Sequence, residues 1–102
     1  MSKYVLSLYV TGKTPRAERA IFNLQRICEN KLQGQYEMSI VDVLEQPELA
    51  EAEKILVTPT LIKQLPLPLQ RIIGDLSDFE KVLFGLGIIP GNLSKKRESL
   101  FE

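Results

Sequence analysis

The segment Tyr4–Val10 constrains the fold more than any other part of the chain. It is apolar on both faces apart from Ser7, which is the pattern of a strand covered on two sides inside a largely parallel sheet. The residues that follow favour a helix, and a strand that leads into a helix commonly opens a βαβ unit. We therefore predict that Tyr4–Val10 is a central strand followed by a helical crossover.

The expected crossover helix has clear boundaries. Thr14 can cap it with its hydroxyl, Pro15 suits the first helical position because its missing N–H would be unpaired there, and Gly34 offers a stop. Apolar residues recur at spacings of three and four and form one stripe that should pack on the sheet: Ala17, Ala20, Ile21, Leu24, Ile27, Cys28 and Leu32. The polar face should meet solvent, with Arg16, Arg19, Asn23, Gln25, Arg26 and Glu29.

Residues 36–44 complete the first half of the chain. They mix aromatic and β-branched side chains, which favour a second strand. A right-handed crossover would lay this strand parallel to the first. Pro47 can then open a short helix that runs to about Lys54, until residues 57–59 force extended backbone.

The second half is ambiguous. Residues 61–65 and 69–73 can form strands, but such short apolar runs also fit helices. Ser77 or Asp78 can cap a final helix, whose apolar face would consist of Phe79, Val82, Leu83 and Leu86. We predict a single α/β domain over residues 1–102, with a flexible tail from about residue 91.

Composition and charge exclude several classes of function. The 13 basic residues cancel the 13 acidic ones, so nothing global indicates nucleic acid. There is no histidine, and the single cysteine, Cys28, lies in the apolar stripe and not at a helix start, where thiolates are stabilised. We expect Cys28 to fill the core, and we expect neither a metal nor a cofactor. Without a signal peptide or an apolar run of about 18 residues, the protein should be cytoplasmic and independent of membranes.

Two loops bear on function. Residues 11–14 sit where a thioredoxin-like domain carries its redox cysteines, and they contain none. Residues 57–60 resemble the proline loop that faces such a site, with Thr58-Pro59 a candidate cis peptide. Residues 12–14 also invite comparison with a phosphate loop, but the glycine which that motif needs five positions earlier is Ser7 here. The sequence predicts an oxidoreductase scaffold without its chemistry.

Many segments spread over roughly residues 3–89 match a known family without gaps. They include Tyr4-Val-Leu, Leu8-Tyr-Val10, Thr14-Pro15, Val41-Asp-Val-Leu44, Leu49-Ala-Glu51, Lys54-Ile-Leu56, Thr58-Pro-Thr-Leu61, Arg71-Ile-Ile-Gly-Asp-Leu-Ser77 and Lys81-Val-Leu83. Through them the chain resembles the KaiB family of circadian clock proteins. The resemblance implies a non-enzymatic regulator that binds the hexameric ATPase KaiC, opposes the activator KaiA and favours KaiC dephosphorylation. It also implies competition with a histidine kinase that carries a related thioredoxin-like sensor domain.

The resemblance further implies two sets of functional residues. Those expected to bind the partner are Arg19, Glu51, Lys54 and Arg71. Those expected to shape or switch the fold are Tyr4, Thr58, Pro59, Gly85 and Gly87. The switch would interconvert a tetramer-forming KaiB fold and a monomeric thioredoxin-like fold through the second half, so the free protein should be a dimer or tetramer.

The chain also departs from the family pattern. Cyanobacterial clock members usually have aspartate at the position of Gly87, tyrosine at that of Pro90, and acidic tails where this chain has Lys95-Lys96-Arg97. An alternative is therefore a stress-adaptation or sensor-like binding module without a clock role. A thiol redox enzyme is disfavoured, because disulfide exchange by this fold needs a thiolate at the helix start.

Overall fold

One four-stranded sheet organises the computed structural model, which describes residues 3–88. The strand order is β2-β1-β3-β4. Strand β1 (Tyr4–Val10) pairs parallel with β2 (Tyr36–Asp42) and antiparallel with β3 (Thr60–Leu65), and β4 (Gln70–Ile73) pairs antiparallel with β3. The central position of β1 and the parallel βαβ unit are confirmed. The expectation of a largely parallel sheet is wrong, because β3 pairs antiparallel with both of its neighbours. The tail from about residue 91, expected to be flexible, lies outside the described residues.

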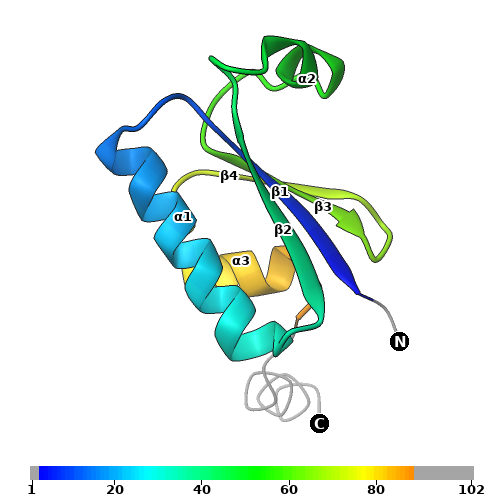
Figure 1. Ribbon diagram of the computed structural model, residues 1–102. Helices are drawn as coiled ribbons and strands as arrows, with labels where there is room; N and C mark the ends of the chain where they lie inside the picture. The colour runs from blue at the N-terminus through cyan, green and yellow to red at the C-terminus, as the bar shows by residue number, and fades with distance from the viewer. Residues whose placement is uncertain (1–2, 89–102) are drawn as a thin grey trace, which may run out of the picture.

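Helices cover the sheet unevenly. Helix α1 (Pro15–Ile27) continues as a π-helical turn, η1 (Cys28–Leu32), and crosses one face of the sheet together with α3 (Phe79–Gly85). Helix α2 (Pro47–Ala52) lies apart from them, near the end at which β1 and β2 finish (Figure 1). One face of the sheet is therefore covered by helices, and α2 stands over one end of the molecule.

The predicted helix starts are confirmed by their caps. Thr14 Oγ1 accepts a hydrogen bond from the Ala17 N–H at 3.1 Å. Asp78 Oδ1 accepts one from the Lys81 N–H at 3.2 Å. Capping depends on residues three positions apart, so the signal is legible in the sequence alone.

The core follows from the alternation of side chains along each strand. On the face covered by α1 and α3, the buried cluster includes Leu6, Leu8, Val10, Ala17, Ala20, Leu24, Ile27, Cys28, Leu61, Ile72, Val82, Leu83 and Leu86. A smaller cluster on the opposite face consists of Tyr9, Val41 and Ile62, with Val43 and Ile55 packed against it. The expected burial of Cys28 is confirmed, and the ambiguous runs of the second half form strands β3 and β4.

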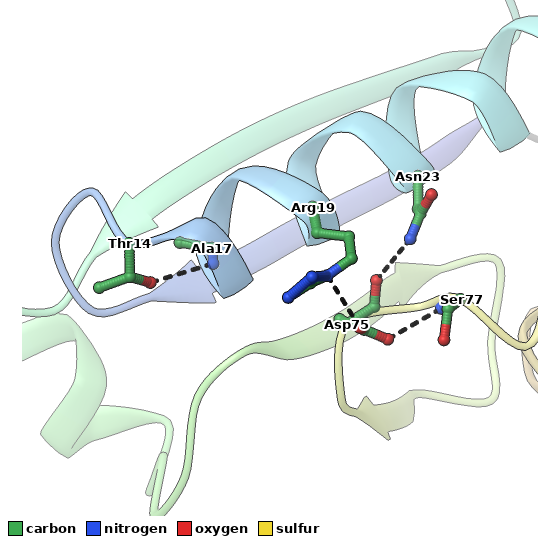
Figure 2. A network of polar contacts seen from close by, with 6 residues as sticks. All are labelled: Thr14, Ala17, Arg19, Asn23, Asp75 and Ser77. Atoms are coloured by element: carbon green, nitrogen blue, oxygen red, sulfur yellow. Dashed lines mark hydrogen bonds and ion pairs between the residues drawn. The ribbon is translucent and has the colours of Figure 1, made fainter.

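One expectation for the polar face of α1 is wrong. Asn23 is buried, and its Nδ2 donates to the Asp75 carbonyl oxygen at 2.9 Å. Arg19 Nε pairs with Asp75 Oδ2 at 3.2 Å, so the turn after β4 folds back on α1 (Figure 2). Hydrogen bonds from Ser77 hold the pKa of the Asp75 carboxyl below its usual value, and the one from the side chain contributes more than the one from the backbone N–H. This network ties the second half of the chain to α1.

Candidate functional site

The two loops singled out in the sequence face each other. Thr11 Oγ1 and Thr58 Oγ1 lie 2.6 Å apart and share a hydrogen bond, and the Thr58-Pro59 peptide is cis, as expected. Cys28 lies elsewhere, buried in the core. Its burial raises the pKa of the thiol to about 11, and the charge of Glu29 adds to this shift. Hydroxyl groups therefore occupy the position at which this kind of fold would place thiols, and they cannot exchange disulfides.

Asp42 fixes the shape of the first loop. Its Oδ1 accepts hydrogen bonds from the Gly12 N–H at 3.0 Å and from the Leu44 N–H at 2.9 Å. The same bonds end β2 at Asp42, two residues before the predicted boundary. Gly12 has φ of 64°, which favours glycine. Sequence reasoning missed this role, although Asp42 stands in one of the segments that carry the family resemblance.

A tight turn follows α2 and presents Lys54 to solvent. The Lys54 N–H donates to the Glu51 carbonyl at 3.1 Å, and the Ile55 N–H donates to the Ala50 carbonyl at 2.9 Å. Lys54 has φ of 55°, in the left-handed region that closes many helix C-termini. The turn lets Ile55 reach the small cluster around Tyr9 while the Lys54 side chain stays exposed.

Apolar side chains are exposed beside this turn. Leu56 is 92% exposed and Val57 is 48% exposed. A hollow of about 170 Å³ opens next to them, lined by Thr11, Val43, Ala50, Ile55, Leu56, Val57 and Thr58. We call Glu51, Lys54, Leu56 and Val57 the turn surface. Exposed apolar groups rimmed by charge are typical of protein-binding surfaces.

Arg71 joins the turn to the sheet. From β4, its Nη2 donates to the carbonyl oxygen of Glu53 and lies 3.6 Å from the Glu53 carboxylate. Tyr9 lies near this pair: burial, and then the Glu53 charge, raises the pKa of its phenol, and the Arg71 charge opposes that shift. Arg71 is therefore held against Glu53, which is the residue that precedes Lys54.

The four expected partner-binding residues are not all brought together. Glu51 and Lys54 lie in the same turn. Arg71 is hydrogen-bonded to Glu53, the residue before Lys54. Arg19 pairs with Asp75 on the α1 side, and no hydrogen bond or ion pair among residues 3–88 joins it to Lys54. Three of the four residues thus belong to one end of the molecule.

The residues expected to shape the fold lie in three places. Thr58 and Pro59 form the second loop, whereas Tyr4 packs against the main core. Gly85 ends α3 so close to β4 that an added Cβ would lie 2.8 Å from Ile72 Cδ1. Gly87 has φ of 79°.

Sequence reasoning also missed Lys63. It is only 4% exposed and donates from Nζ to the Leu86 carbonyl at 3.5 Å. A lysine within an apolar run gives no local sign that it will meet the end of a helix 23 positions away.

Residues 3–88 lack two other kinds of feature. That part of the chain has no group of three His, Cys, Asp or Glu side chains placed to hold a metal ion. None of its helices is long and apolar enough to cross a membrane.

The facing hydroxyl-bearing loops and the mixed sheet define a thioredoxin-like protein outside the thiol-redox class. The N-terminal domain of Synechococcus elongatus SasA superposes with a TM-score of 0.69 at 25% identity, covering 87% of this chain and 88% of that one. Mitochondrial thioredoxin 3 from Saccharomyces cerevisiae superposes with a TM-score of 0.68 at 15% identity, covering 85% of this chain and 79% of that one, and it shows the fold alone. The expected thioredoxin-like fold is confirmed.

Sequence comparison gives the family. The KaiB domain model matches residues 7–88. The circadian clock protein KaiB3 of Synechocystis is 61% identical over 93 residues, 91% of each chain. The circadian clock oscillator protein KaiB of Synechococcus elongatus is 57% identical over 90 residues, 88% of each chain. The chain belongs to the KaiB family, whose members are regulatory clock proteins and not enzymes.

Proposed function

We propose that this protein binds a KaiC-type ATPase through the turn surface, opposes activation by a KaiA-type protein and favours KaiC dephosphorylation. The observation that carries the proposal is the exposed Lys54 turn beside exposed Leu56 and Val57, in a chain of the KaiB family. The same surface would serve competition with a histidine kinase, since the SasA domain shares the fold. The protein would act in the cytoplasm, without nucleic acid or membrane as a partner.

The chemistry of the turn surface defines what the partner must present. Lys54 would pair with a carboxylate of the partner, and Glu51 would pair with a cation. Leu56 and Val57 would pack on an apolar patch that excludes water around those charges. Charge pairs at the rim would guide association and orient the partner. Arg19, whose side chain is 52% exposed beside Asp75, is proposed as a second, separate contact.

Reversal of one charge tests the binding surface. Lys54→Glu should weaken binding to a KaiC homologue in the presence of ATP by about tenfold or more, because it sets like charges against each other. Titration calorimetry measures the affinity, and thermal unfolding checks that the fold is unchanged. Lys31→Glu makes the same reversal in η1, away from the turn, and should leave the affinity unaltered. Equal affinities for Lys54→Glu and the wild type would remove Lys54 from the site.

We also propose that the free protein forms a dimer or tetramer in a second fold and that the thioredoxin-like arrangement is the one that binds the partner. Two kinds of feature in the second half support this proposal. Gly85 and Gly87 lie at the end of α3, where glycine weakens a helix, and apolar side chains are exposed along the β3–β4 hairpin. Tyr4 in β1, together with Thr58 and Pro59 before β3, would also influence the balance.

A further inference from the structure

We propose that Arg71 is a positioning residue that holds the turn surface in shape and makes that surface depend on β4 being part of the sheet. The inference rests on the proposed function, because the turn surface is the proposed binding site. It assigns Arg71 a role inside this chain, acting on the partner through Lys54.

The geometry of Arg71 suits a brace. In the β-ladder it is opposite Ile62, which belongs to the small cluster on the sheet face opposite α1 and α3. From there its guanidinium reaches both the backbone oxygen and the carboxylate of Glu53. A guanidinium presents several N–H donors in a fixed plane, so it can hold a backbone group and a carboxylate at once. Arg71 thereby joins the edge strand to the residue before Lys54.

The turn has few other supports. Helix α2 has six residues, and within the described part of the chain it has neither a side-chain N-cap bond nor a buried residue. So short a helix is marginal without packing. Lys54 also adopts a left-handed conformation, which is unfavourable for a residue with a Cβ. Within residues 3–88, the backbone bonds of the turn are supplemented by the packing of Ile55 and by the two contacts of Arg71.

Charge strengthens the same conclusion. Glu53 places a carboxylate near the buried phenol of Tyr9, and the ion pair between Arg71 and Glu53 supplies the cation that offsets that charge. If Arg71 is removed, Glu53 loses its charged partner and the turn loses its link to the sheet. Because Arg71 comes from β4, a chain in which β4 is not placed beside β3 lacks this brace.

The positioning role differs from direct contact with the partner in two measurable ways. Arg71 is 39% exposed, so a direct contact is sterically open to it. A direct contact predicts no change in the free protein, and it predicts a loss of affinity independent of Lys54. Positioning predicts a looser turn in the free protein and a loss of affinity that depends on Lys54.

The first experiment uses the free protein. In Arg71→Gln, NMR hydrogen exchange at the Lys54 and Ile55 amides should become about tenfold faster, the loss expected for a hydrogen bond to a charged group. The amides of Leu61 and Ile62 should keep their wild-type rates, and Arg71→Lys should show an intermediate effect. Lys81→Gln removes the same charge from the groove between β4 and α3, and it should leave the turn unchanged. Wild-type exchange at Lys54 and Ile55 in Arg71→Gln would overturn the proposal whether or not KaiC binds.

The second experiment is a double-mutant cycle in which affinity for a KaiC homologue with ATP is measured. Arg71→Gln should lower affinity about tenfold in the wild type, but much less in a Lys54→Ala background, because the side chain being positioned is then gone. Fully additive losses would mean that Arg71 contacts the partner independently, and they would refute positioning. If neither variant alters affinity while exchange at the turn still rises, the positioning of the turn stands and the proposed binding surface fails.

Discussion

Lys63 is a cation enclosed beside the end of α3. Its ammonium donates to the Leu86 carbonyl, where the partial negative charge of a helix C-terminus favours a cation. A Cβ added at Gly87 would lie 3.8 Å from Lys63 Nζ. The position of Gly87 is therefore next to a buried positive charge in this chain.

Substitution of Gly87 tests both its backbone and this charge. Gly87→Ala should lower the free energy of unfolding by about 1 kcal/mol, because φ is 79° and alanine is strained there. Gly87→Asp should lower it less than Gly87→Asn, since both side chains tolerate this conformation but only the carboxylate attracts Lys63. Urea unfolding measures all three. Equal stabilities for the Asp and Asn variants would show that Lys63 does not sense this position.

Cys28 gives a prediction for alkaline pH. Its folded-state pKa is about 11, against an ordinary value of 9.0, because the buried thiol resists losing its proton. Above pH 9 the unfolded chain has therefore released a proton that the folded chain keeps, and this lowers the free energy of unfolding as pH rises toward 11. Cys28→Ala lacks the titrating group, so the stability advantage of the wild type should shrink over that interval. Urea unfolding at several pH values checks this, and a constant difference would contradict it.

At the scale of elements, prediction from sequence succeeded where the signal is local. The start of α1 depends on Thr14 and Pro15, and the βαβ unit on a long apolar strand and a continuous stripe. It failed where a partner is distant: Asn23 is buried by Asp75, 52 positions away. Runs as short as those of β3 and β4 have no clear period, so only the pairing of β3 with β1 decides that they are strands.

The candidate site divides in the same way. The facing of the two loops was predicted from residues 57–60 and from the strand before Thr11, and the exposure of Lys54 is consistent with the role proposed for it. The contact between Arg71 and Glu53 was not predicted, because it joins side chain and backbone 18 positions apart across two elements. Contacts of this kind depend on tertiary packing, which a single sequence does not display.

Helix α3 provides the prediction at this scale. Gly85→Ala should raise the free energy of unfolding by up to about 1 kcal/mol, because alanine favours helix over glycine. The new methyl group would lie 2.8 Å from Ile72 Cδ1 and 3.0 Å from Ile72 Cγ1, so the gain requires the Ile72 side chain to turn toward the groove between β4 and α3 that it borders. Gly85→Val needs more space and should destabilise the protein. Equal losses for both variants in urea unfolding would mean that Ile72 cannot move.

The molecule as a whole has apolar surface that this arrangement leaves uncovered. Leu65, Leu67 and Leu69 are 47%, 75% and 49% exposed along the β3–β4 hairpin. Two prolines separate these leucines, so the segment extends neither strand far. Burial of such side chains contributes about 25 cal/mol for each Å² removed from water. A second packing, or an oligomer that covers the leucines, therefore needs to recover only a few kcal/mol to compete with this fold.

This competition predicts slow exchange between two sets of backbone NMR signals for residues beyond Ala50 in the free protein. Dilution should favour the set that matches the thioredoxin-like arrangement, because an oligomer dissociates by mass action. Leu67→Lys should do the same at constant concentration, since a charge at that position opposes burial in an oligomer but is tolerated on an exposed hairpin. Lys81→Glu, an exposed charge change on α3, serves as the control and should leave the ratio near its wild-type value. A single set of signals with the same strands in free and KaiC-bound protein would show that one fold serves both states, and the turn surface would then be available at all times.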